Sequence, residues 1–230
     1  MKLIDLSMEI SKETLVHQSF VPPVLLDWET HEQSFKRFGS GHSYWAKMIM
    51  MIDHVGTHVD AYCHFDPNDP EGTIDTMPLD MFYTPGVCLD FGHLSPKTEV
   101  TVEHLEQACE KDKIEIKPGY TVLLYWGHYE RTKGTPAYLT DYPGRMREGV
   151  EWLAEKKIHL FGVEQPNPGL NDDKAFTVHT VCAERHLPHI ENLINLQELL
   201  GKGVFQFIAF PLKFKGGTGS PVRAVAVIDT

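Results

Sequence analysis

One short stretch of the chain gathers side chains that could bind a metal ion and move a proton. It holds three histidines and one aspartate, namely His54, His58, Asp60 and His64. Because the four positions differ by even numbers, an extended segment would carry all of these side chains on one side, whereas a helix would not. Two imidazoles and a carboxylate that leave room for water are typical of an open catalytic metal site. The stretch therefore predicts metal ligands at His54, His58 and Asp60. The alternative is that some of these histidines are surface or core residues without a ligand role.

A second group of such residues lies downstream, at His179, His186, His189 and Glu191. His179 follows the loop over residues 164–168, just after an expected strand end, where ligand-binding residues of α/β sheets gather. Glu191 stands among apolar residues, and a buried carboxylate needs a cationic partner or a metal. A helix cap or a simple salt bridge would explain Glu191 equally well. His186 and His189 flank a Leu-Pro pair and are interpreted as surface residues.

The elements that must position these side chains alternate between strands and helices. Strands are expected over residues 2–6, 44–52, 86–91, 121–126, 158–163, 204–211 and 222–228, and helices over residues 102–111, capped by Thr101, and 147–157. The apolar run over residues 48–52 is expected to be a buried strand. This order favours an α/β fold in a single domain over residues 1–230. Its central mixed β-sheet, barrel-like or of the swivelling β/α type, would be flanked by helices.

The segment over residues 11–41 shows no regular pattern. A structureless loop of this length inside a compact domain is uncommon and usually functional. We expect it to be either a lid or an arm that reaches a neighbouring subunit.

Composition excludes several kinds of partner. Lys and Arg number 21 against 32 for Asp and Glu, a formal net charge of −11, and no basic run is present that could displace counterions from phosphates. Nucleic acid and anionic membranes are therefore not expected as partners. No apolar run approaches the ~20 residues of a membrane span, and the start does not resemble a signal peptide. The four cysteines form no C-x-x-C pair, so reduced thiols and a cytoplasmic location are expected.

Other catalytic templates do not fit the sequence. His31-Glu32 is followed by Gln33-Ser34-Phe35, so it is not an H-E-x-x-H zinc motif. No G-x-S-x-G elbow, Walker A loop or G-x-G-x-x-G run is present. The histidine-rich stretch remains the strongest chemical signal.

Residues 54–65 read His-x-Gly-Thr-His-x-Asp-x-x-x-His-Phe, which resembles the signature of the metal-dependent cyclase family. That family includes bacterial kynurenine formamidases (arylformamidases) and isatin hydrolases. Agreement extends to residues 5–7, 143–144, 190–193, 209–213 and 219–224. The resemblance thus covers nearly the whole chain as one domain.

The resemblance implies a site for one or two divalent metals, Zn²⁺ or Mn²⁺. In the family pattern His54, His58 and Asp60 hold one metal, and His179 and Glu191 help to hold the second. Asp60 and Glu191 would bridge the two ions, and His64 would be the acid/base residue. Some relatives work with a single Mn²⁺, and relatives also suggest a homodimer or a larger assembly.

Two departures from the family pattern concern the substrate. Tyr62 stands where the family usually has proline, and His17 stands where kynurenine formamidases carry a tryptophan. We therefore expect His17, Phe20 and Tyr62 to contact the substrate, and N-formylkynurenine to be a poorer substrate than a smaller or more polar amide or lactam. The alternative is that Trp28, Phe20 or Phe35 replaces the missing aromatic wall.

The function that we expect is metal-dependent hydrolysis of an amide-like C–N bond in a small formamide or lactam. A metal lowers the pKa of bound water and polarises a carbonyl, and His64 could move the proton from that water to the leaving nitrogen. Mixed imidazole and carboxylate ligands suit Zn²⁺ and tolerate Mn²⁺. The alternatives are a cyclase or lyase reaction on another carbonyl metabolite, and a non-catalytic metal- or metabolite-binding protein. A pure binding site would not need His64.

Overall fold

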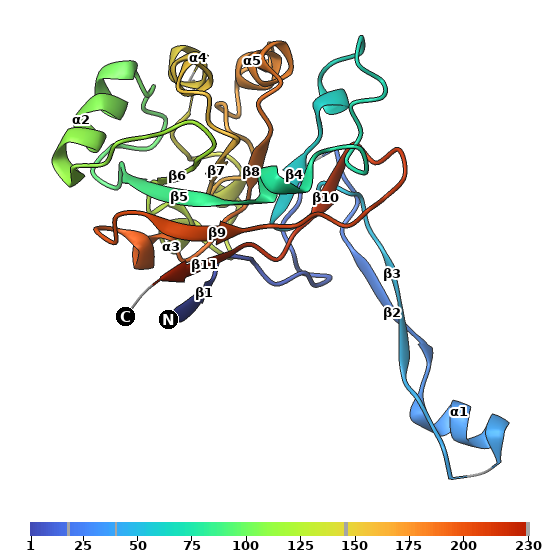
Figure 1. The fold of residues 1–230 in the computed structure, drawn as a ribbon. Helices are drawn as coiled ribbons and strands as arrows, with labels where there is room; N and C mark the ends of the chain where they lie inside the picture. Colours follow the sequence, from blue (N-terminus) through green and yellow to red (C-terminus); the bar gives the residue numbers. More distant parts are fainter. Residues whose placement is uncertain (18, 40, 145–146, 229–230) are drawn as a thin grey trace.

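A curled mixed sheet of nine strands organises the computed structural model, which describes residues 1–17, 19–39, 41–144 and 147–228 (Figure 1). The strands are β1 (Lys2–Asp5), β4 (His58–Asp60), β5 (Tyr83–Asp90), β6 (Thr121–Tyr125), β7 (Leu160–Val163), β8 (His189–Glu191), β9 (Phe205–Ile208), β10 (Gly219–Pro221) and β11 (Val225–Ile228). Their order across the sheet is β1-β11-β9-β5-β6-β7-β8-β4-β10. Strands β5 to β8 run parallel, and all other neighbours are antiparallel. This confirms the expected α/β class with a central mixed sheet.

Helices α2 (Val102–Asp112), α4 (Arg147–Glu155) and α5 (Thr177–Arg185) lie along one face of the parallel strands, as Figure 1 shows, and α3 (His128–Thr132) follows β6. The predicted cap of α2 is confirmed, since the Thr101 hydroxyl accepts a hydrogen bond from the His104 backbone N–H. Helix α5 was not predicted. The parallel strands need crossover connections of this kind, which place helices over the sheet.

Two apolar layers cover the two faces of the sheet. Between sheet and helices, Val122 and Leu124 of β6 pack with Leu105 of α2 and Leu153 of α4. Leu123 of β6 points to the opposite face, where it packs within the curl of the sheet. Burial on both faces explains why the parallel strands read as unbroken apolar runs.

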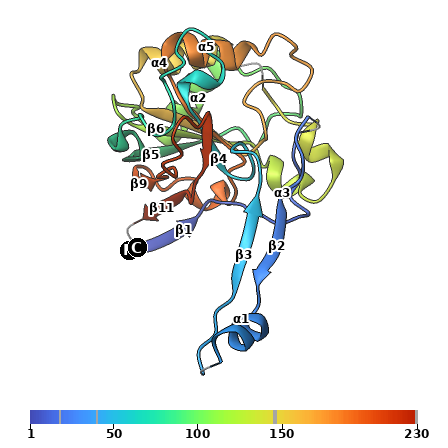
Figure 2. The ribbon, with the colours of Figure 1, turned by 90° about the vertical axis from the view of Figure 1, so that its right-hand side faces the viewer.

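An arm projects from this body (Figures 1 and 2). It consists of β2 (Val24–Glu29), helix α1 (His31–Phe38) and β3 (Ala46–Met50), and β2 pairs antiparallel with β3. Helix α1 begins at a capping box formed by Thr30 and Gln33 and ends at Gly39, whose φ of 65° favours glycine. The expectation of an irregular segment over residues 11–41 is therefore wrong in part, since the arm is built from regular elements.

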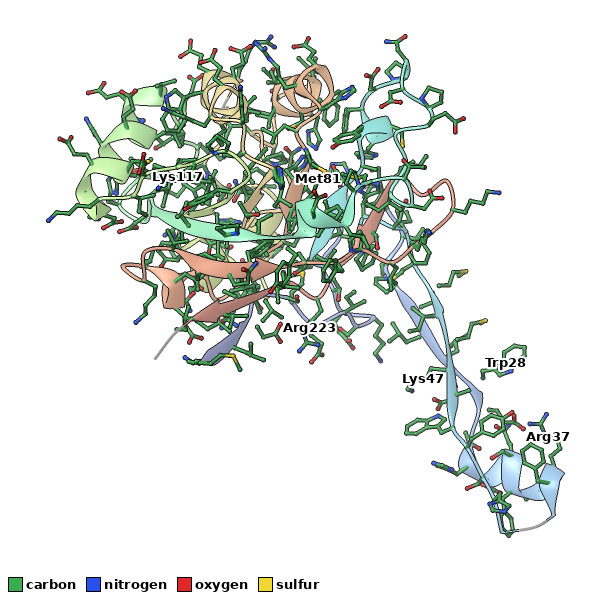
Figure 3. The ribbon with its side chains drawn as sticks, viewed as in Figure 1. Trp28, Arg37, Lys47, Met81, Lys117 and Arg223 are labelled. Atoms are coloured by element: carbon green, nitrogen blue, oxygen red, sulfur yellow. The ribbon has the colours of Figure 1, made fainter. Side chains whose placement is uncertain are left out.

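The expected buried strand over residues 48–52 is also wrong. Met48, Ile49 and Met50 lie on β3 and are 40%, 59% and 60% exposed, respectively. Trp28 projects from the arm into open space, whereas Arg37 and Lys47 form ion pairs on the arm with Glu29 and Asp27 (Figure 3). The apolar run is explained by its place on the arm and not by burial in the sheet.

Two further expectations can be compared with the fold. Cys63, Cys88, Cys109 and Cys182 are all free thiols. Across the described ranges of the chain, no helix combines the length and the apolar character that crossing a membrane requires.

Glu164, which directly follows β7, is hydrogen-bonded to the backbone at the start of α3. Its side chain is fully buried, and its Oε2 accepts hydrogen bonds from the backbone N–H groups of Trp126, at 2.5 Å, and His128, at 3.3 Å. Burial raises the pKa of this carboxyl to about 8, against these two N–H groups and with the help of the neighbouring Glu130. The folded protein therefore keeps a proton on Glu164 that the unfolded chain loses at lower pH.

We predict that Glu164→Gln reduces the pH dependence of stability. Because the pKa of Glu164 is raised in the folded state, its contribution is complete below the ordinary value of 4.5 and is lost as pH rises through about 8. The free energy of unfolding in denaturant should fall less steeply from pH 5 to pH 9 in the variant than in the wild type. The exposed Glu155, changed to Gln, is the control that should leave the slope unchanged. Equal slopes in all three proteins would contradict the assignment.

Candidate metal centre

Two neighbouring short strands carry the centre. Strands β4 and β8 pair antiparallel, with His58 directly opposite Glu191. Side chains two apart on a strand point to the same side. Asp60 therefore joins His58 on β4, and His189 joins Glu191 on β8. All four are buried, at 2% to 5% exposed.

Three further histidines reach the same place from outside these strands. His54 precedes β4 and returns to it through a turn at Gly56, whose φ is +71°. His64 ends a short 3-10 turn over Tyr62–His64, and His179 lies in the first turn of α5. The stretch forms a strand only over His58–Asp60, and loops and a helix bring in the other histidines.

Gly219 makes the close approach of His54 possible. It lies on β10 opposite Asp60. A Cβ atom at this position would come within 2.6 Å of His54 Cε1 and 2.9 Å of the Val59 carbonyl oxygen. The glycine near the end of the chain thus leaves the space that the imidazole occupies.

Asp60 divides its two oxygens between two groups of histidines. Its Oδ1 lies 2.7 Å from His54 Nδ1 and 3.3 Å from His58 Nε2. Its Oδ2 lies 3.3 Å from His189 Nε2 and 3.9 Å from His179 Nε2.

Glu191 is divided in the same way. Its Oε2 lies 3.5 Å from His58 Nε2, whereas its Oε1 lies 3.2 Å from His189 Nε2 and 3.5 Å from His179 Nε2. Each carboxylate therefore presents one oxygen to each group of histidines. This is the arrangement that a carboxylate bridging two metals would have.

The residues fit a divalent metal by spacing as well as by type. Two sets of residues each offer ligand atoms that lie within 4.8 Å of one another. The first set is Asp60, His179, His189 and Glu191, and the second is His54, His58 and Asp60. Ligands bound at about 2.1 Å around a tetrahedral ion are roughly 3.4 Å apart. The N···O separations of 3.2 to 3.9 Å between His58, His179 or His189 and the two carboxylates match that spacing.

Both carboxylates are held in the charged form. Burial raises the pKa of Asp60, but the neighbouring His54 and His189 outweigh it and hold the pKa well below its ordinary value. Burial also raises the pKa of Glu191, yet hydrogen bonds from His179 and His189 lower it to about 2. The centre thus holds two buried negative charges, which a divalent cation would neutralise.

His189 was missed as a member of the centre, because its interpretation as a surface residue is wrong. It is 2% exposed, and its ring stacks on Phe161 at a centroid distance of 5.4 Å. His186, by contrast, is exposed as expected. The spacing of His189 and Glu191, two apart like His58 and Asp60, is the signal in the sequence that could have identified it.

The Gly56 backbone carbonyl orients the ring of His58. His58 Nδ1 lies 2.8 Å from the Gly56 carbonyl oxygen, which also accepts a hydrogen bond from the Asn192 side-chain amide at 2.9 Å. The second nitrogen of a metal-binding histidine commonly donates to such a group. The contact directs His58 Nε2 toward Asp60 and Glu191.

His64 stands at the edge of the centre. Its ring stacks on His54 at 3.9 Å between centroids, and its Nε2 lies 3.9 Å from Asp60 Oδ2. Burial lowers the pKa of His64 to about 4 against the opposing effect of Asp60. At neutral pH the imidazole of His64 is therefore uncharged.

A cavity of about 230 Å³ opens onto the centre. It is bordered by His17 and Phe20 from the N-terminal segment and also by Phe65, Asn167 and Phe176. Phe65 and Phe176 were not predicted from the sequence. They provide aromatic walls, and the Phe65 ring lies 4.1 Å from the His179 ring between centroids.

Tyr62, Trp28 and Phe35 do not border this cavity. The Tyr62 ring stacks on His186 at 5.1 Å, and its hydroxyl donates to Met81 Sδ at 3.3 Å. Trp28 and Phe35 belong to the arm and are exposed. Of the residues expected near the substrate, the structure thus places His17 and Phe20 at the cavity and Tyr62 beside it.

The model of the Cyclase family matches residues 4–169 of the chain. A kynurenine formamidase of Paracidovorax citrulli (strain AAC00-1) is 33% identical over 179 residues, which make up 77% of each chain. A kynurenine formamidase of Bacillus cereus (strain ATCC 14579) is 29% identical over 198 residues, 85% of this chain and 86% of that protein. Among solved structures, isatin hydrolase A from Ralstonia solanacearum superposes with a TM-score of 0.85 at 26% identity, over 99% of this chain and 92% of the other.

We predict that His189→Ala lowers metal affinity and that His186→Ala does not. The first change removes an imidazole that faces both carboxylates, and the second removes an exposed ring three residues away. Metal content after dialysis, measured by element-specific emission, should drop in His189→Ala and stay at the wild-type level in His186→Ala. Full metal content in His189→Ala would remove this residue from the centre.

Proposed function

This chain belongs to the Cyclase family, and we propose on that basis that it is a metal-dependent hydrolase of an amide-like C–N bond in a small molecule. The observation that carries the proposal is the division of Asp60 and Glu191 between two groups of histidines, beside a cavity with aromatic walls. The names of its relatives, kynurenine formamidase and isatin hydrolase, describe hydrolysis of such bonds.

The residues of the centre divide into two ligand sets. His54 and His58 would hold one divalent ion and His179 and His189 the other, with Asp60 shared between them. Glu191 faces both sets through its two oxygens. We propose Zn²⁺ or Mn²⁺, one or two per chain, because mixed imidazole and carboxylate ligands suit both ions. The bound metal supplies a Lewis acid that activates water and polarises the substrate carbonyl.

His64 is the proposed acid/base residue. It borders the cavity and contacts Asp60 and the ring of His54, yet it belongs to neither ligand set. Its side chain is 26% exposed, so water and substrate can reach it. From this position His64 can accept a proton from the attacking water and return it to the leaving nitrogen.

The substrate that we propose is a formamide or a lactam that has a planar part and is smaller or more polar than N-formylkynurenine. Phe65 and Phe176 offer faces against which a flat ring can pack. His17, which is 2.7 Å from the Ser19 hydroxyl through its Nδ1, places a polar ring on the other side of the cavity. A polar group on the substrate would pair with His17. We therefore expect such a substrate to have a higher kcat/KM than N-formylkynurenine.

A substrate panel with and without a chelator tests this proposal. Aryl formamides, N-formylkynurenine and isatin-like lactams should be hydrolysed with a loss of activity in chelator that added Zn²⁺ or Mn²⁺ restores. A kcat/KM of ~10⁵ M⁻¹s⁻¹ or more is usual for a natural substrate, and such a value for N-formylkynurenine would contradict the proposed preference. Turnover without hydrolysis would indicate a lyase, and metal binding without turnover of any compound would indicate a binding protein.

We predict that His64→Ala keeps its metal but loses turnover by roughly 10²–10⁴-fold, the usual contribution of general acid–base catalysis. The substitution leaves both ligand sets intact. Metal content, measured as for His189→Ala, should therefore stay at the wild-type level. A loss of metal equal to that of His58→Ala would make His64 a ligand instead. Unchanged kcat would remove it from the mechanism.

We also propose that the chain forms a homodimer, or a larger assembly, through its arm. A two-stranded hairpin is marginally stable alone in water, and the arm exposes large apolar side chains, including Trp28, Trp45 and Ile49. Apolar surface of this kind is typical of protein interfaces. A second copy of the chain is the partner that we propose for it.

Light scattering after size exclusion tests the assembly. The wild type should have at least twice the mass of one chain, and Ile49→Asp should shift the mass toward that of the monomer, because a charge would be buried at the contact. Val204→Asp, at an exposed apolar position before β9, is the matched control. A wild-type monomer would contradict the proposal.

A further inference from the structure

Two histidines of the centre have a ring nitrogen without a partner. Nδ1 of His179 and Nδ1 of His189 are both buried and make no hydrogen bond within the described residues, unlike Nδ1 of His58. The second N–H of a metal-binding histidine ordinarily donates to a carboxylate, a carbonyl or water, which fixes the tautomer and the ring. A buried N–H without a partner is costly. The ring of His189 therefore needs a group that can accept from its Nδ1.

Cys182 is the candidate for that acceptor. It is 7% exposed on α5, three residues after His179, so that both side chains lie on the same side of the helix. Its side chain borders the same crevice as the His189 ring. Cys182 belongs to neither ligand set, so the described geometry does not make it a metal ligand.

A narrow crevice beside the centre is bordered by the same residues. It is lined by Cys182, His179 and His189 together with Tyr62 and Leu187. Its free volume of about 10 Å³ for water centres is near the minimum that one water molecule needs. The sulfur can thus meet the imidazole N–H directly after a small shift, or through one water.

We propose that Cys182 is a positioning residue of the metal centre, whose sulfur accepts the Nδ1–H of His189 and keeps Nε2 of that ring directed at Asp60 and Glu191. This inference rests on the metal-dependent function proposed above.

A cysteine suits this place better than a third carboxylate for an electrostatic reason. The centre already holds two buried carboxylates, and a third would add a buried negative charge that the available cations would have to offset. A thiol is a weak acceptor that packs like a small apolar side chain. It can orient the imidazole without changing the charge of the centre.

Two substitutions separate positioning from packing. Cys182→Ser keeps an acceptor but loses volume, whereas Cys182→Val roughly keeps the volume but has no acceptor. Zn²⁺ affinity would be measured by competition with a chromophoric chelator, and Mn²⁺ affinity in the same way. We expect Cys182→Ser to stay within about 3-fold of the wild type and Cys182→Val to bind 10–100-fold more weakly, the usual range for loss of such a contact.

The proposal is decided by which of the two variants binds metal more weakly. If Cys182 serves only packing, Cys182→Val should bind metal like the wild type and Cys182→Ser should be the poorer variant, and that order would overturn the proposal. Circular dichroism of the metal-free proteins checks that both variants fold, and Cys182→Ala replaces either one that does not, with the expectation given for Cys182→Val. Cys109→Val, at a half-buried thiol on α2, is the control and should bind like the wild type. A wild-type protein that binds neither ion would overturn the metal-dependent function itself, and this inference with it.

Discussion

Two carboxylates that are buried side by side, Asp60 and Glu191, set the condition that the surrounding structure must meet. Ionised carboxylates so far from water are unfavourable unless cations or N–H groups surround them. Four buried imidazoles, those of His54, His58, His179 and His189, converge on these oxygens. A site with this balance of charges and nitrogen donors could hold a divalent metal.

The sheet topology supplies this arrangement at low cost. Strand β8 is the last of the parallel strands, and β4 adds to its free edge in the antiparallel direction. Strands β4 and β8 each place two side chains on the same face. Strand β10 pairs with β4, and its Gly219 leaves the space that His54 occupies. Strands β5, β6 and β7 carry apolar side chains on both faces, and the polar centre lies on the short strands β8 and β4 at one side of the sheet.

The sequence was informative where local spacing determines geometry. His58 and Asp60 belong to one strand, and their convergence follows from the period of two. His179 and Glu191 were assigned by resemblance, and His189 was missed because its burial depends on the pairing of β8 with β4 and β7, which is non-local. Helix α5 escaped prediction because its inner side mixes His179 and Cys182 with apolar residues and gives no clear helical period.

The arm shows the opposite limit. The apolar run of Met48, Ile49 and Met50 predicts a buried strand, yet all three side chains are exposed in the structure. A strand that pairs only with β2 leaves these side chains outside the body of the domain. Hydropathy alone does not distinguish a core strand from an exposed strand on an arm.

The most direct test of the proposed metal centre is anomalous X-ray scattering at the metal absorption edge, on crystals of protein purified without added metal. The account predicts a peak beside His54 and His58, a peak beside His179 and His189, or both, each with an Asp60 oxygen at about 2.0–2.2 Å. Crystals at neutral pH that show no metal between the two carboxylates, or a metal bound elsewhere, would contradict it.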